Sequence, residues 1–197
     1  MVCADRKTII QILGSLMSRP ELLNDIDKYQ LEPTDFVQQM DKFIFSAIYN
    51  LYVGGAENIH TTDIDAYLSK NEVAKELMEK ENGHQFLMDC EAYGNPANFS
   101  YYYKELKKIN LVRQLQKSGY DTSDIYSENP MDEGHFTINE KFKKLSTEDI
   151  INSLKAKIAE LEDKYVINAV IKEGSAYDGV RELIGILEKS PEVGVRL

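Results

Sequence analysis

The sequence predicts an all-α protein, built as a globular bundle of short helices, a long helical hairpin and a C-terminal linker helix. Three observations support this fold class. Apolar residues recur every three or four positions along most of the chain, no segment shows sustained strand alternation, and helix start signals precede several of the periodic segments. With 197 residues, the chain is long enough for one domain with an appendage. We divide it into a head, 1–95, a hairpin, 96–172, and a linker helix, 173–197.

Short helices account for the head. The first is marked by four apolar residues on one face: Ile9, Ile12, Leu13 and Leu16. The second shows the same spacing at Ile44, Ala47, Ile48 and Leu51. A capping box, a pair of polar side chains that bind the free amides at a helix start, is predicted at 62–65, where Thr62 and Asp65 stand three residues apart. Phe86, Leu87 and Cys90 indicate a further short helix.

Two longer periodic segments predict the hairpin. The first opens at Asn98 and carries Phe99, Tyr102, Leu106, Ile109 and Val112. The second follows a capping box at 146–149 and carries a stripe spaced 3, 4, 3 and 4: Ile151, Leu154, Ile158, Leu161 and Tyr165. A stripe of this kind needs a facing helix, within the chain or in another subunit. The residues expected in this hairpin or oligomer seam are Leu106, Ile109, Ile151, Leu154, Ile158 and Leu161. The conformation of 127–145 stays open.

The last predicted element, a helix over 176–189, is set apart by Gly174 and Pro191. Ser175 and Asp178 form a possible capping box at its start. Its apolar face consists of Val180, Leu183, Ile184 and Leu187. A helix this short is marginal in water until that face is covered. The cover could be the chain's own core or another subunit.

The charge argues against a general nucleic-acid-binding surface. The chain has 33 acidic and 23 basic residues, a net charge of −10, whereas nucleic-acid affinity rests largely on Lys and Arg. One segment, 100–119, is locally basic with a net charge of +4 and three neighbouring tyrosines. We expect its lysines to meet acidic residues or water. No signal peptide or apolar run of membrane-spanning length is evident, and the two cysteines make no disulfide framework, so we expect a cytoplasmic protein without membrane contact.

Motifs for chemistry are absent from the sequence. His60, His84 and His135 are isolated, and neither a zinc-binding spacing nor a GxSxG nucleophile motif occurs. The glycine spacing of 174–179 is that of a phosphate-binding loop, but Val180 and Arg181 stand where Lys and Ser or Thr are required. We therefore predict no catalytic, cofactor-binding or metal-binding residue in this chain.

Four segments, taken in order, resemble the N-terminal domain of DnaB-type replicative DNA helicases. They are residues 12–17, ILGSLM; 35–36, DF; 43–48, FIFSAI; and 63–68, DIDAYL. The order continues through Asn98-Phe99, residues 111–113, residues 119–121, the second hairpin helix and the closing phrase 191–197, PEVGVRL. In the family, a phrase like the last one leads into a RecA-like ATPase domain, at the point where this chain stops.

The resemblance implies a collar domain of a hexameric helicase that unwinds duplex DNA. Such domains assemble with each other, from dimer to hexamer, and dock primase and, in some systems, a helicase loader. ATP, magnesium and single-stranded DNA would be bound by the downstream domain, so the chain alone would be inactive. The helix 176–189 would match the linker that packs on the neighbouring subunit's ATPase domain, through Val180, Leu183, Ile184 and Leu187.

Three alternatives remain at this point. The first is a stand-alone primosome or loader-type interaction protein without an ATPase of its own. The second is an enzyme that uses carboxylates such as Asp63 and Asp65, which would have to cluster in a pocket. The third is direct DNA binding by 100–119, which would weaken steeply with salt.

Overall fold

A computed structural model describes residues 4–167, and all of its regular structure in that range is helical. The predicted fold class is therefore confirmed for the described residues. The chain divides into two compact units, Met1–Thr147 and Glu148–Leu197. No described helix is long and apolar enough to cross a membrane. The predicted linker helix, with Val180, Leu183, Ile184 and Leu187, lies outside the described residues.

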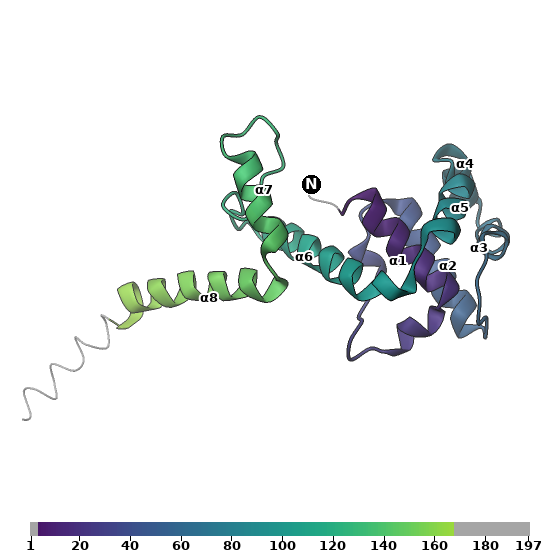
Figure 1. The fold of residues 1–197 in the computed structure, drawn as a ribbon, viewed down its shortest axis with the longest axis horizontal. Helices are drawn as coiled ribbons and strands as arrows, with labels where there is room; N and C mark the ends of the chain where they lie inside the picture. The colour runs from purple at the N-terminus through teal and green to yellow at the C-terminus, as the bar shows by residue number, and fades with distance from the viewer. Residues whose placement is uncertain (1–3, 168–197) are drawn as a thin grey trace, which may run out of the picture. The chain divides into compact units, whose positions relative to one another are not determined.

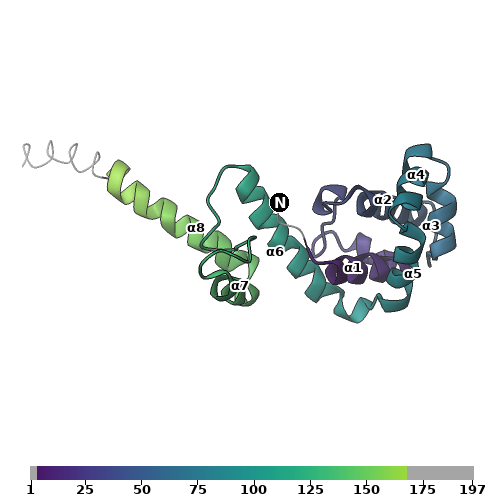
Figure 2. The same cartoon turned by 90° about the horizontal axis from the view of Figure 1, so that it is seen from above.

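The first unit contains seven α-helices among the described residues (Figure 1). Their bounds are α1 Arg6–Ser18, α2 Gln39–Val53, α3 Thr61–Leu68, α4 Glu72–Lys80, α5 Gly83–Tyr93, α6 Phe99–Lys117 and α7 His135–Lys144. Short 3₁₀ turns, Pro20–Asn24, Pro33–Asp35 and Pro96–Asn98, connect several of them. In the view of Figure 2, α3 and α4 lie together at one end of the head.

Helix starts in the head are set by short polar side chains. The Asp5 carboxylate accepts from the Thr8 amide at 2.7 Å and caps α1. Asn71 caps α4 in the same way, through the Ala74 amide at 3.1 Å. Both bonds satisfy amides that have no partner inside the helix.

The capping box predicted at 62–65 is wrong. The capping pair is His60 and Asp63, two residues earlier: α3 begins at Thr61, and Asp63 accepts from the His60 amide at 2.8 Å. The predicted pair, Thr62 and Asp65, therefore lies inside the helix. Both pairs have the same three-residue spacing, which explains why the pattern alone selected the wrong one.

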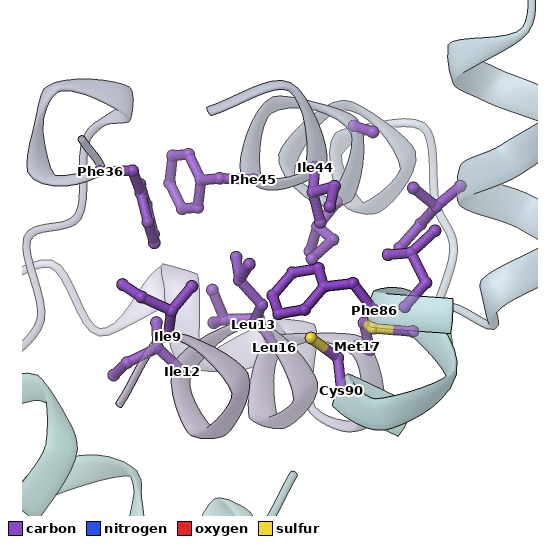
Figure 3. Packing of buried hydrophobic residues seen from close by; sticks show 14 of the residues in the cluster. Ile9, Ile12, Leu13, Leu16, Met17, Phe36, Ile44, Phe45, Phe86 and Cys90 are labelled. Carbon is purple, nitrogen blue, oxygen red and sulfur yellow. The ribbon is translucent and has the colours of Figure 1, made fainter. Parts of the chain in front are cut away.

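The hydrophobic core lies between α1 and the helices around it. Figure 3 shows Leu13 and Leu16 of α1 facing Ile44 and Phe45 of α2, with Cys90 entering from α5. Leu13, Leu16 and Ile44 are fully buried, and Cys90 is as well. The predicted inner faces of α1 and α2 are thus confirmed. Burial raises the pKa of the Cys90 thiol to about 12, so this cysteine packs as a small apolar side chain.

Two glycines allow α1 and α5 to approach each other closely. A Cβ atom added to Gly14 of α1 would lie 2.0 Å from the Cys90 carbonyl oxygen. One added to Gly94, which caps α5, would lie 2.4 Å from the Gly14 carbonyl carbon. Both obstacles are backbone atoms, which cannot rotate away as a side chain could. The backbones therefore touch at this crossing, and only glycine fits at either position.

A buried carboxylate joins the loop before α2 to α6. Asp35, in the turn Pro33–Asp35, accepts from Lys107 Nζ at 2.8 and 2.9 Å and from Asn110 Nδ2 at 2.8 Å. It also accepts from the Glu32 amide at 2.9 Å, while Arg113 Nη2 donates to the Thr34 carbonyl oxygen at 2.9 Å. The next residue, Phe36, is 1% exposed in the core.

Helix α7 was not predicted, and it lies in the segment 127–145 that the sequence left open. Lys108 of α6, itself 2% exposed, lies over the ring of Phe142 with Nζ 4.9 Å from the centroid. Its ammonium also pairs with Glu105 at 2.9 Å. Tyr126 packs edge-on against Phe142 at 5.0 Å between centroids. A buried cation–aromatic contact therefore attaches α7 to α6.

We predict that Gly14→Ala destabilises the fold by about 3 kcal/mol, because the added methyl group meets backbone that must move. Urea unfolding followed by circular dichroism measures this loss. The exposed Lys7, in the same helix, provides the control, and Lys7→Ala should stay within about 0.5 kcal/mol of wild type. An unchanged midpoint for Gly14→Ala would refute the close crossing of α1 and α5.

We predict that Asp35→Asn destabilises the fold by about 2 kcal/mol, because it replaces a buried carboxylate, which accepts several hydrogen bonds, by a neutral amide. The matched control is Asp25→Asn, whose partner Lys28 lies 4.0 Å away between exposed side chains; we expect less than about 0.5 kcal/mol there. Equal losses for the two variants in urea unfolding would contradict a special role for Asp35.

Candidate interaction surfaces

Three of the five basic side chains in segment 100–119 bind other groups of the protein. Lys107 binds Asp35, Lys108 pairs with Glu105 and covers Phe142, and Arg113 donates to the carbonyl oxygens of Thr34 and Asp35. Lys108 and Arg113 are each 2% exposed. Of this segment's five basic residues, only Lys104 and Lys117 have exposed side chains. The expectation that these lysines meet acidic residues is therefore confirmed for Lys107 and Lys108.

The tyrosines of the same segment also pack, in part, against the head. Tyr103 stacks with Phe99 at 6.3 Å between ring centroids and lies edge-on to Tyr29 at 5.1 Å. Its hydroxyl accepts from the Gln30 amide at 3.0 Å. Tyr101 remains 63% exposed. A stacking platform for bases needs open aromatic faces along a basic groove, and this helix uses most of those groups internally.

Of the residues predicted for the hairpin or oligomer seam, the two on α6 lie in or beside the head. Leu106 is 1% exposed and belongs to the core of the first unit, and Ile109 is half-buried. The predicted pairing of α6 with the second hairpin helix involves two different units, and it stays a prediction.

The second unit carries the apolar stripe of α8, Thr147–Glu162, which continues as a short π-helical stretch, Asp163–Ile167. This helix begins where the sequence predicted. Ile151 and Leu154 are half-buried, whereas Ile158, Leu161 and Tyr165 are 48%, 55% and 66% exposed. Residues at these spacings share one helix face. A contiguous apolar face open to solvent is typical of a protein–protein interface.

The carboxylates considered as an enzyme site serve local structure. Asp63 accepts from the His60 amide at the start of α3. Asp65 pairs with His84 of α5 at 2.5 Å. Among the described residues, no group of three or more His, Cys, Asp or Glu side chains is arranged to hold a metal ion. The two carboxylates thus have separate partners instead of sharing a pocket.

A serine, a histidine and an aspartate do meet beside α7. Ser127 Oγ lies 3.0 Å from His135 Nδ1 and 3.2 Å from Asp132 Oδ2. In a nucleophilic triad the carboxylate orients the histidine, but here it contacts the serine itself. The Ser127 amide donates to Asn139 Oδ1 at 3.1 Å, and Asn139 Nδ2 donates to the Ser127 carbonyl oxygen at 3.0 Å. These hydrogen bonds therefore stabilise the loop before α7.

Sequence reasoning missed two arrangements. Helix α7 has its inner residues Ile138 and Phe142 four apart, a spacing that could have indicated a short helix in 127–145. The pairs His60–Glu91 and His84–Asp65, both between α3 and α5, join residues 31 and 19 positions apart. No local pattern signals such distant pairs.

Comparisons with known proteins agree with this helical head. The family model for the DnaB-like helicase N-terminal domain matches residues 10–108. The chain is 29% identical over 194 residues to the SPbeta prophage-derived uncharacterized protein YorI of Bacillus subtilis (strain 168). That alignment covers 98% of this chain and 38% of YorI, so the chain spans well under half the length of this relative.

A solved structure supports the fold independently. The N-terminal domain of DnaB helicase from Mycobacterium tuberculosis matches with a TM-score of 0.51 and 22% sequence identity, over 60% of this chain and 81% of that domain. At this identity the likeness concerns the fold alone. The family match, in contrast, spans half of the chain, from the first helix to the middle of α6. The chain belongs to the family of DnaB-like helicase N-terminal domains.

Proposed function

We propose that the chain is the oligomerisation and partner-docking domain of a hexameric replicative DNA helicase. The observation that carries this proposal is the open apolar stripe of α8, in a chain of this family. Burial of apolar surface contributes roughly 25 cal/mol per Å², so an exposed stripe is a ready contact for another subunit. Self-association from dimer to hexamer would cover it.

The chemistry of unwinding belongs, in this proposal, to a domain beyond this chain. ATP and magnesium would bind there, and this chain would hold no cofactor and show no activity alone. The relative YorI, of which the chain matches only 38%, is compatible with a longer parent protein. Primase and, in some systems, a helicase loader are the expected partners of the collar in the cytoplasm, during DNA replication.

Single-stranded DNA would be bound only by the downstream domain. Lys107, Lys108 and Arg113 already bind partners within the protein, and this supports the assignment of DNA binding to the downstream domain. The net charge of −10 points the same way. A second function in DNA binding by this chain is therefore not favoured.

We predict that the full chain self-associates and that the double variant Ile158→Glu, Leu161→Glu shifts it to monomer. Two carboxylates on the stripe would have to be buried without partners, which strongly disfavours the contact. Light scattering coupled to size exclusion, over a range of concentrations, measures the mass against the 22.5 kDa of one chain.

The control for this experiment is Ala156→Glu. Ala156 is an exposed residue of α8 on the side opposite Ile158, so this variant adds the same kind of charge away from the stripe. It should retain the wild-type mass. A wild-type chain that stays monomeric at high concentration, or a double variant that still associates, would count against the stripe as the contact.

We also predict that the full chain does not bind single-stranded DNA, even at low ionic strength. Fluorescence anisotropy of a labelled oligonucleotide measures this. Binding that weakens steeply with added salt, and that is lost in Lys104→Ala or Lys117→Ala, would contradict the prediction, since those are the exposed cations of 100–119.

A further inference from the structure

Two imidazole–carboxylate pairs join α3 to α5, one near each end of their contact. At one end, His60 Nδ1 lies 2.7 Å from Glu91 Oε1. At the other, His84 Nδ1 lies 2.5 Å from Asp65 Oδ2. The two pairs are oriented in opposite ways. In the first pair the histidine comes from the start of α3, and in the second it comes from the first turn of α5. The protein has three histidines, and two of them are in this seam.

Glu91 does more than pair with a histidine. Its Oε2 accepts from the Thr61 amide at 3.0 Å and from the Thr61 hydroxyl at 2.7 Å. Thr61 is the first residue of α3, so the carboxylate of α5 satisfies a free amide at the start of the other helix. These bonds, with His60, lower the pKa of Glu91 to about 2. Glu91 is therefore charged throughout the physiological range.

The two histidine side chains, in contrast, lie within reach of solvent. The His60 and His84 side chains are 64% and 63% exposed. His60 faces Glu91 on α5 and Asp63 on its own helix. His84 faces Asp65 on α3, and Lys75 and Glu79 of α4 line the same depression with opposite charges. Carboxylates thus face both imidazoles, and the hydrogen bond to Glu91 favours the charged form of His60.

We propose that the seam between α3 and α5 is a proton-dependent clasp, which holds α3 more tightly when His60 is charged. The core side of α3, with Ile64 fully buried, packs in either state. Loss of the charge on His60 therefore increases local opening of α3 and leaves the crossing of α1 and α5 intact. This property is independent of the proposed role in a helicase.

The direction of the effect follows from His60. The pKa of His60 is raised in the folded protein. The larger cause is its hydrogen bond to Glu91, and the next is the negative charge of Glu91. A raised folded-state pKa gives stability that is fully present below the unfolded pKa, about 6.5, and is lost as the pH rises through the folded pKa. The clasp thus loosens upward from about pH 6.5.

Native-state hydrogen exchange of the full chain tests the clasp. After correction for intrinsic exchange, the protection of α3 amides relative to α1 amides should fall about two- to five-fold between pH 5.5 and pH 7.5, the range expected for weak exposed ion pairs. The double variant His60→Gln, His84→Gln should lose this pH dependence. Protection that does not change with pH, or that changes equally in the double variant, would overturn the proposal.

The third histidine supplies the control. His135 contacts Ser127 and Asn139 beside α7, so His135→Gln should leave the pH dependence of α3 unchanged. A titration of the His60 ring by NMR gives a second test. Glu91→Gln keeps an oxygen acceptor for Thr61 but removes the charge, and the midpoint of His60 should fall. An unchanged midpoint would show that the pair does not couple α3 to protonation.

Discussion

The backbone contact between Gly14 and Gly94 is the constraint on which the head depends. Because neither residue has a Cβ atom, α1 and α5 approach until the Gly14 and Cys90 backbones touch. That approach brings Cys90 into the core beside Leu13 and Leu16 (Figure 3). It also places α5 where Glu91 and His84 meet α3. The LGSLM segment near the start of the chain is thus a packing motif with a definite steric cause.

The second constraint is electrostatic and acts between distant parts of the first unit. Asp35 precedes α2 in the chain and holds α6 through Lys107 and Asn110. These contacts turn Lys107 and Asn110 of α6 toward the head of the protein. Among the described residues of the second unit, α8 carries exposed apolar side chains at Ile158, Leu161 and Tyr165.

Local pattern predicted much of the fold. The inner faces of α1, α2 and α6 follow from spacings of three and four residues, and the start of α8 from its capping signal. The partners of those faces could not be predicted, because Gly14 and Gly94 are 80 positions apart and Asp35 and Lys107 are 72 apart. Helix α7 has one short local signal, Ile138 and Phe142 four residues apart, but its attachment to α6 through Lys108 lies outside any window around 135–144. Of the candidate site, the stripe on α8 was visible in the sequence, whereas the packing of Leu106 into the core of the head, instead of a hairpin seam, was not.

The central claim is that this chain is the collar of an ATP-driven helicase, and the coding sequence beyond Leu197 tests it most directly. Our account predicts an open frame that continues into a strand followed by GxxxxGK[ST], the loop that binds the phosphates of ATP. A stop codon directly after Leu197 would contradict the account, and would favour a stand-alone interaction protein of the primosome.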